Sequence, residues 1–288
     1  MKISFITLLI IFLTLSSISI NAQEKNKSLL WKISGKNLSK PSYLFGTIHI
    51  ICITDFIWTD AMNNSFNECE KVCFEMNLND PNFMTESASA FFDKTGKQLK
   101  DYFIKEDYLK LKKYFKENVG IDVDLLRQLK PVALQSFLIS KIPNCIKTVS
   151  YEDSLMKIAK TQKKEIIGLE TVKEQIEALE SISNDTIVNN LMEVINKNTN
   201  ENKEYDKLFS AYKSQDLPLI NSLLTQSDIE QTEIKALLND RNTKWITRII
   251  DKINYSSVFF AVGAAHLYGE IGVINLLKKQ GYTLEPIK

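Results

Sequence analysis

The chain has only two histidines, and both stand at the end of the same motif, a glycine, two further residues and the histidine. One copy spans residues 46–49 (GTIH) and the other spans residues 263–266 (GAAH), each after an apolar, aromatic run. At a background glycine frequency of roughly 7%, both histidines would carry this glycine by chance in about 0.5% of cases. Neutral imidazole is the commonest metal ligand and a common proton carrier near neutral pH. The matched pair therefore indicates one composite site built around His49 and His266.

Two glutamates are candidates for the same site. Glu75 follows Phe74 in an otherwise apolar segment, where an unpaired carboxylate would be costly to bury. A metal ion or a cationic partner would offset that cost. Two imidazoles, a carboxylate and an open position form the ligand set of many hydrolytic metal sites, in which bound water becomes the nucleophile. We therefore take His49, Glu75, Glu170 and His266 as candidate ligands of a divalent ion such as Mn, Co or Zn.

Other interpretations of these residues stay open. Without a metal, the two imidazoles and the carboxylate could act as a general acid and base. Each histidine could also bond locally while Glu75 pairs with a lysine, which would make all three structural. The helical zinc signatures with two histidines and a glutamate are absent, as are a Gly-x-Ser-x-Gly nucleophile motif and a phosphate-binding glycine loop.

Arg241 and Asn242 lie in a predicted helix whose apolar face includes Trp245. An arginine at the rim of a site binds a carboxylate or stabilises an oxyanion. A surface salt bridge explains the same arginine equally well. We take Glu75, Arg241 and Asn242 as the candidate catalytic residues.

Composition excludes little but favours an ordinary folded protein. The 288 residues are 44% hydrophobic and 25% charged, which suits one large domain or two small ones. The formal net charge is +1, from 36 Lys and Arg against 35 Asp and Glu. Proteins that bind nucleic acid usually carry a basic footprint, so no nucleic-acid partner is expected.

The N-terminus has the layout of a secretory signal peptide. A basic start precedes an apolar run and then a small, polar stretch that ends at Ala22, an imperfect small-x-small cleavage site. We expect a signal peptide at residues 1–22, a single domain at residues 23–288, and export to the periplasm or the medium. An uncleaved membrane anchor is the alternative, but the run is short for a span and no later segment is long enough.

Four cysteines, Cys52, Cys69, Cys73 and Cys145, allow three disulfide pairings that the sequence does not distinguish. Export makes disulfides permissible. A zinc site would normally show tighter Cys-x-x-Cys pairs, so a disulfide or buried free thiols are the preferred interpretation.

Apolar runs and turn residues predict the elements that carry these motifs. Strands are expected at residues 29–33, 42–45, 72–78, 165–170, 257–262 and 283–287. Helical spacing predicts helices at residues 54–70, 98–118, 125–142, 151–161, 172–182, 187–217, 228–253 and 271–279. A strand, the Gly-x-x-His motif, a helix and a strand thus follow one another near each terminus, as in an ancient half-repeat.

This order predicts a mixed α/β (α+β) fold. A central mixed sheet is built from the two terminal strand–Gly-x-x-His–helix–strand units, and a large helical insertion covers it. Ligand sites in such sheets gather at the carboxyl ends of the strands. His49, Glu75, Glu170 and His266 all fall at such ends.

Several segments together carry a resemblance to a known family. In chain order they are Leu30-Trp31-Lys32-Ile33, Ser42 to His49, Phe74-Glu75-Met76, Gly168 to Thr171 with Glu174 and Gln175, Arg241-Asn242 with Trp245, and Val262 to Gly269 with Gly272, Leu276, Leu277, Gly281 and Tyr282. They cover almost all of residues 23–288, and the chain resembles the TraB/GumN family. That family is related to the Tiki proteases and more distantly to erythromycin-esterase and ChaN-like proteins.

The resemblance implies an exported metal-dependent hydrolase, most simply a peptidase, because Tiki proteins are metalloproteases that cut an extracellular signalling protein. It implies that His49, Glu75 and His266 are ligands or catalytic groups, with Arg241 and Asn242 beside them. The expected partner is a peptide or a small-molecule substrate. The alternatives are a non-catalytic protein of the same fold that sequesters a peptide or ligand, and a haem- or iron-handling protein like the ChaN-like relatives.

Overall fold

The structure is a computed structural model that describes residues 27–139, 145–196, 203–226 and 230–288. The predicted signal peptide at residues 1–22 lies outside the described residues. Among the described helices, none is long and apolar enough to cross a membrane.

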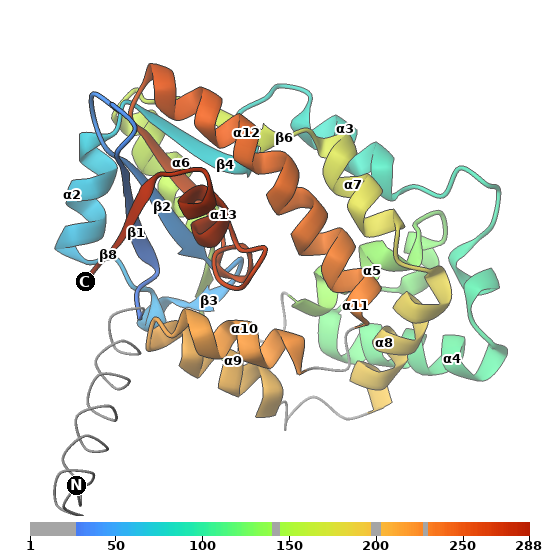
Figure 1. The fold of residues 1–288 in the computed structure, drawn as a ribbon. Coiled ribbons are helices and arrows are strands. Elements are labelled where there is room, and N and C mark those ends of the chain that lie inside the picture. Colours follow the sequence, from blue (N-terminus) through green and yellow to red (C-terminus); the bar gives the residue numbers. More distant parts are fainter. Residues whose placement is uncertain (1–26, 140–144, 197–202, 227–229) are drawn as a thin grey trace, which may run out of the picture.

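A six-stranded mixed sheet forms the centre of the molecule, as predicted (Figure 1). Its strands, in spatial order, are β6 (Glu165–Glu170), β4 (Lys71–Met76), β7 (Val258–Gly263), β2 (Ser42–Thr47), β1 (Leu30–Ser34) and β8 (Thr283–Ile287). The first four run parallel to one another, whereas β1 pairs antiparallel with both β2 and β8. The four parallel strands therefore present their carboxyl ends along one edge.

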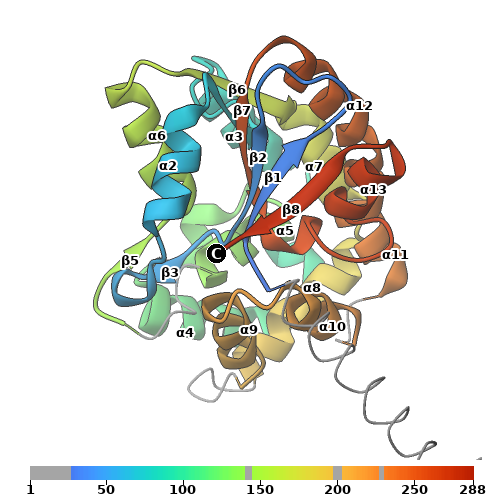
Figure 2. The same cartoon turned by 60° about the vertical axis from the view of Figure 1, so that its left-hand side comes forward.

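Helices cover both faces of the sheet. Figure 2 shows α2 (Asp60–Glu68) and α6 (Tyr151–Thr161) on one side, with α12 (Asp240–Tyr255) and α13 (Val273–Lys279) on the other. Burial on both faces explains why β2 and β7 are continuous apolar runs without alternation. The predicted bounds of α6 agree with the structure, whereas α2 starts later than predicted, at Asp60, where the Thr59 hydroxyl caps the helix.

Much of the helical insertion lies beside the sheet. Helices α3 (Phe83–Phe91), α4 (Lys105–Tyr114), α5 (Pro131–Ile139), α7 (Val172–Glu180) and α8 (Asn184–Asn196) occupy the right of Figure 1. Leu111, Leu134 and Leu191 belong to a second hydrophobic core there, separate from the core of the sheet. The insertion therefore supplies its own core as well as a cover.

Of the two longest predicted helices, the one at 187–217 is broken in the structure, whereas the one at 228–253 is continuous over residues 231–255. The segment predicted at 187–217 divides into α8 and α9 (Lys203–Lys213), and α10 (Leu217–Thr225) follows. The segment predicted at 228–253 contains α11 (Gln231–Ile234), a π-helical turn (Lys235–Asn239) and then α12.

The two terminal units share the Gly-x-x-His motif but end differently. In the first unit, β4 returns to the sheet parallel to β7. In the second, β8 lies at the far edge and pairs antiparallel with β1. The units are therefore not equivalent in topology beyond their first strand and motif.

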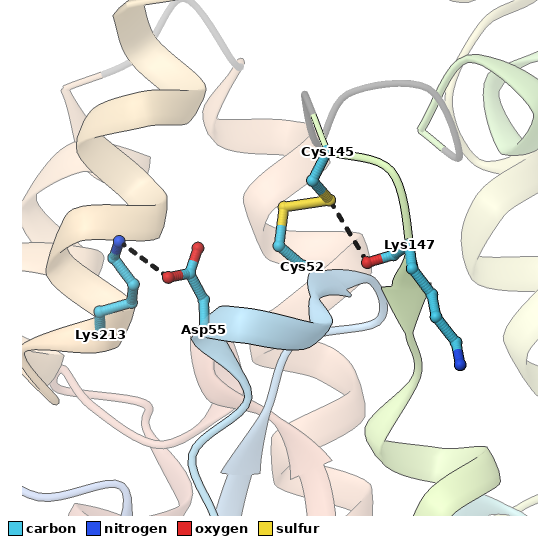
Figure 3. Close-up of a disulfide and its surroundings, with 5 residues drawn as sticks. All are labelled: Cys52, Asp55, Cys145, Lys147 and Lys213. Atoms are coloured by element: carbon cyan, nitrogen blue, oxygen red, sulfur yellow. Dashed lines mark hydrogen bonds and ion pairs between the residues drawn. A yellow bond between two sulfur atoms is a disulfide. The ribbon is translucent and has the colours of Figure 1, made fainter.

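A disulfide resolves the cysteine pairing that the sequence left open. Cys52 is bonded to Cys145, with Cα atoms 6.0 Å apart, and Cys69 and Cys73 are buried free thiols (Figure 3). The bond lies beside a small antiparallel ladder of β3 (Ile51–Cys52) and β5 (Thr148–Val149). This ladder joins the segment after His49 to the segment before α6.

Candidate active site

Each of the four parallel strands delivers one candidate residue to the same edge of the sheet. Glu170 is the last residue of β6, and Glu75 is the penultimate residue of β4. His266 ends the short 3-10 turn that follows β7, and His49 lies just after β2. Because β2 and β7 are neighbours with Thr47 opposite Gly263, the two Gly-x-x-His motifs start side by side.

Arg241 of α12 joins the two carboxylates. Its Nη2 donates to Glu75 Oε2 and to Glu170 Oε1, both at 2.6 Å, and its Nε lies 3.1 and 3.2 Å from the two Glu170 oxygens. Its Nη1 donates to the Leu237 carbonyl at 2.9 Å. All three charged side chains are largely shielded from solvent, which strengthens this charge-assisted pairing. The structure thus places Arg241 at the centre of the site and not in a surface salt bridge.

Trp245 completes the surroundings of the arginine. It lies one helical turn after Arg241, its Nε1 donates to Glu170 Oε2 at 2.9 Å, and its ring stacks against His266 at 4.4 Å between centroids. The Arg241 guanidinium lies 4.9 Å from the centre of the same ring. A buried tryptophan usually needs a hydrogen-bond acceptor for its N–H, so Trp245 was a signal in the sequence that an acceptor lies near Arg241.

Asn242 fixes the orientation of His266. The Asn242 amide nitrogen donates to the carbonyls of His266 and Ile271, so its Oδ1 faces the ring and lies 2.6 Å from Nδ1. An amide oxygen only accepts, so Nδ1 carries the proton and Nε2 is left with a lone pair. Burial lowers the pKa of His266 to about 3, with Arg241 adding to the effect and the Glu75 carboxylate opposing it. His266 is therefore neutral at physiological pH.

Glu75 is held as a carboxylate beside that histidine. The Gly263 N–H donates to its Oε1 at 2.9 Å, and Gln175 Nε2 donates to its Oε2 at 3.1 Å. Burial favours the neutral acid, but electrostatic attraction to His266, Arg241 and His49, in that order, and the Gly263 N–H hold its pKa at about 2. Its Oε1 lies 3.7 Å from His266 Nε2.

His49 contacts a different carboxylate. Its side chain is 68% exposed, and its Nδ1 lies 3.5 Å from Oε1 of Glu152 in the first turn of α6. Hydrogen bonding to Glu152 raises the pKa of His49 to about 9, and the charges of Glu152 and Glu75 assist the shift. Glu152 was not predicted, because nothing in the sequence links a helix start at residue 151 to the loop after β2.

The predicted metal ligands fit a divalent ion only in part. Glu75 and His266 offer a carboxylate oxygen and a bare imidazole nitrogen close together, which is suitable donor chemistry. However, Arg241 Nη1 lies 3.2 Å from that nitrogen, and Glu170 is taken up by Arg241 and Trp245. Within the described part of the chain, no group of three or more His, Cys, Asp or Glu side chains is arranged to hold a metal ion.

Comparison with known proteins finds sequence similarity along most of the chain. Residues 29–286 match a sequence profile described as the TraB/PrgY/gumN family. Among curated proteins, the chain is similar to Metalloprotease TIKI1 of Danio rerio (24% identity over 91% of this chain and 64% of the relative) and to Metalloprotease TIKI1 of Homo sapiens (25%, 91% and 62%). It is also similar to the Metalloprotease TIKI homolog of Nematostella vectensis (22%, 92% and 68%). The chain thus spans under two thirds of the length of the first two relatives, and no solved structure matches it.

Proposed function

Because this chain belongs to the TraB/PrgY/gumN family, we propose that it is a metal-dependent hydrolase, and more finely an exported peptidase. Relatives named metalloproteases align with nine tenths of the chain, which supports the coarser statement. The observation that carries the proposal is the pairing of a neutral His266, whose Nε2 carries a lone pair, with the Glu75 carboxylate, 3.7 Å away.

The protonation states favour metal ligation over metal-free acid–base catalysis. A general acid or base works best with a pKa near the working pH. The pKa of Glu75 is about 2 and that of His266 about 3, so both are poor proton acceptors at neutral pH. A carboxylate and a neutral imidazole are, by contrast, the states that a metal ion binds.

The ligands would be Glu75 and His266, with His49 as the third donor and Mn, Co or Zn as the ion. When bound, such an ion supplies Lewis acidity that polarises a scissile carbonyl and activates water. Asn242 holds the His266 ring so that Nε2 stays bare, and Gln175 with the Gly263 N–H orients Glu75. Arg241 neutralises Glu75 and Glu170 and provides a cation for a substrate carboxylate or a developing oxyanion.

Export is the expected route of this protein. A disulfide between Cys52 and Cys145 is typical of an oxidising compartment, which agrees with the predicted signal peptide at residues 1–22. The expected partner remains a peptide or a small molecule.

A sequestering protein of the same fold is the second candidate. It is favoured by Arg241, which already satisfies Glu75 and Glu170 and lies against His266 Nε2. A buried centre that is already neutralised suits ligand binding without chemistry.

Incubation with a peptide library separates the two functions. The protein is mixed with the library and Mn²⁺, Co²⁺ or Zn²⁺, and products are identified by mass spectrometry. The hydrolase proposal predicts cleavage that a chelator abolishes and that Glu75→Gln lacks, while Glu174→Gln, in an ion pair with Arg248 outside the centre, retains it. Peptides that are retained intact by the protein under all three ions would favour sequestration instead.

A further inference from the structure

One carboxylate organises the loop that carries His49. The Thr47 hydroxyl donates to Glu152 Oε1 at 2.8 Å, and the Ser150 hydroxyl donates to Glu152 Oε2 at 2.9 Å. His49 Nδ1 approaches the same Oε1 at 3.5 Å. The Glu152 side chain is 19% exposed, so these polar contacts form at a largely shielded position.

The backbone on either side of these residues is fixed by independent contacts. The buried Tyr212 hydroxyl donates to the Gly46 carbonyl at 2.9 Å, at the start of the motif. After the motif, Ile51 and Cys52 pair with Val149 and Thr148, and the Cys52–Cys145 disulfide closes this ladder (Figure 3). The Lys213–Asp55 ion pair ties the following turn to α9. These contacts fix the position of the His49 loop relative to the start of α6.

Both histidines of the motifs have a side-chain oxygen near Nδ1, at 2.6 Å for His266 and at 3.5 Å for His49. His266 Nδ1 meets the Asn242 amide oxygen, and His49 Nδ1 faces the Glu152 carboxylate. An acceptor at Nδ1 selects the tautomer whose Nε2 carries the lone pair. The acceptors come from unrelated elements, α12 in one case and α6 in the other.

We propose that Glu152 is the positioning residue of His49: with Thr47, it holds Nδ1 of the ring, so that Nε2 is the nitrogen that gives up its proton and carries the lone pair of the neutral ring, as Asn242 does for His266. The inference rests on the proposed function only for what Nε2 would bind, which is a metal ion. The orientation of the ring does not depend on that function. Glu152 acts through His49 and contacts no substrate.

The orientation is read by NMR without any metal. Because the chain has only two histidines, long-range ¹H–¹⁵N spectra give two ring patterns, which His266→Gln assigns. The spectra are recorded above the His49 pKa of about 9, where the ring is neutral. The proposal predicts that His49 carries its proton on Nδ1 in the unmodified protein and on Nε2 in Glu152→Ala.

Asp153→Ala is the matched control, because Asp153 also carries a carboxylate in the first turn of α6 but is exposed and is not the partner of His49 or Thr47. It should leave the His49 spectrum unchanged. Thr47→Val removes the hydroxyl that holds Glu152 and keeps the side-chain shape, so it should shift the tautomer partly even if Glu152→Ala folds poorly. Thr47→Ser should restore the original pattern. A His49 tautomer that is the same in the unmodified protein, Glu152→Ala and Thr47→Val would overturn the inference.

Calorimetric titration with Mn²⁺ measures how far the loss of Glu152 weakens metal binding. Loss of a carboxylate that orients a ligating histidine typically weakens metal binding about 10- to 100-fold, which is the loss expected for Glu152→Ala and not for Asp153→Ala. If the unmodified protein binds no Mn²⁺, Co²⁺ or Zn²⁺, the proposed function fails while the NMR result still decides the role of Glu152. If metal binds equally to both proteins and the tautomer is unchanged, only the role of Glu152 is refuted.

Discussion

At the scale of single residues, the same motif holds two histidines in opposite states. His266 is buried beside the Arg241 cation, whereas His49 is exposed beside the Glu152 carboxylate. At neutral pH the first is neutral and the second is protonated, because their pKa values are about 3 and about 9. The neighbouring side chains, and not the motif, set the charge of each imidazole.

These shifts predict a stability maximum near pH 6.5. The pKa of His49 is raised from 6.5, so its contribution to stability is complete below pH 6.5 and is lost as pH rises to about 9. The pKa of Glu75 is lowered from 4.5, so its contribution is present above pH 4.5 and is lost as pH falls to about 2. His266, lowered from 6.5, adds to the acid loss because the unfolded chain takes up its proton between pH 6.5 and 3.

Urea midpoints measured from pH 3 to pH 9 in the presence of a chelator check this profile. His49→Asn should remove most of the decline above pH 6.5 and leave the acid side unchanged. Since the His49 ring is 68% exposed, solvent screening keeps this alkaline decline small. An alkaline decline of equal size in both proteins would assign it to other groups.

Removal of the buried cation is expected to be costly. Arg241→Gln leaves Glu75 and Glu170 without their shared partner, and breaking a buried ion pair in this way costs about 3–5 kcal/mol of unfolding free energy. Arg248→Gln, on the same helix, breaks a part-exposed pair with Glu174 and should cost about 0–1 kcal/mol. Urea denaturation at pH 7 compares the two, and equal losses would mean that the central network does not stabilise the fold.

At the scale of elements, the motif glycines serve close packing more than a special turn. Neither Gly46 nor Gly263 has a positive φ, and Gly263 has a φ of −51°. A Cβ on Gly46 would lie 3.1 Å from the Cα and Cβ of Ala264, in the neighbouring motif. The glycine therefore lets the two motifs approach each other.

Gly46→Ala tests this explanation. The added methyl group has to displace backbone and Leu267, and such overpacking typically costs about 1–3 kcal/mol. Gly263→Ala meets only the Glu75 carboxylate and the His266 ring, at 3.3 and 3.5 Å, and should cost less. Urea midpoints of both variants should show this order, and the reverse order would contradict the packing argument.

The Cys52–Cys145 disulfide should stabilise the His49 loop and the whole domain. It closes a chain separation of 93 residues, and removal of a native disulfide typically costs about 2–4 kcal/mol. Thermal unfolding with and without a reductant should show a lower melting temperature on reduction of the unmodified protein. The double variant Cys52→Ser/Cys145→Ser should already melt low and should not respond to the reductant, since Cys69 and Cys73 are free. A reductant effect of the same size in the double variant would contradict this.

The sequence predicted the strands and helices with strong periodicity, and it missed the short contacts between distant segments. All six strands of the sheet were expected, because their apolar runs are bounded by turn residues. The two-residue strands β3 and β5 carry no periodic signal, so the ladder beside His49 was not foreseen.

The candidate site was also predicted in part, with its main residues expected and the contacts between distant segments missed. Arg241, Asn242, Glu75, Glu170 and His266 come together as a group, because parallel strands and a covering helix converge at one sheet edge. The partner of His49 could not be predicted, since it depends on how the start of α6 lies against β2. The sequence also gave no indication that Arg241 would lie between the proposed ligands.

At the scale of the whole molecule, five strands from the two ends of the chain and β6 from its middle build the sheet, and the helices of the middle build its surroundings. β1 and β2 from the N-terminal end lie between β7 and β8 from the C-terminal end (Figure 1). The helices between them supply Glu152, Gln175, Arg241 and Asn242 to the sheet edge. A site divided in this way forms only when the complete domain folds.

Anomalous diffraction from crystals of the protein soaked in Mn²⁺ tests the central proposal most directly. A metal-dependent hydrolase predicts one anomalous peak coordinated by both a Glu75 oxygen and His266 Nε2. The His49 ring should reach the same peak, and Arg241 Nη1 should withdraw from His266. A crystal with no peak at this edge, and with Arg241 still joining Glu75 to Glu170, would contradict the proposed metal site.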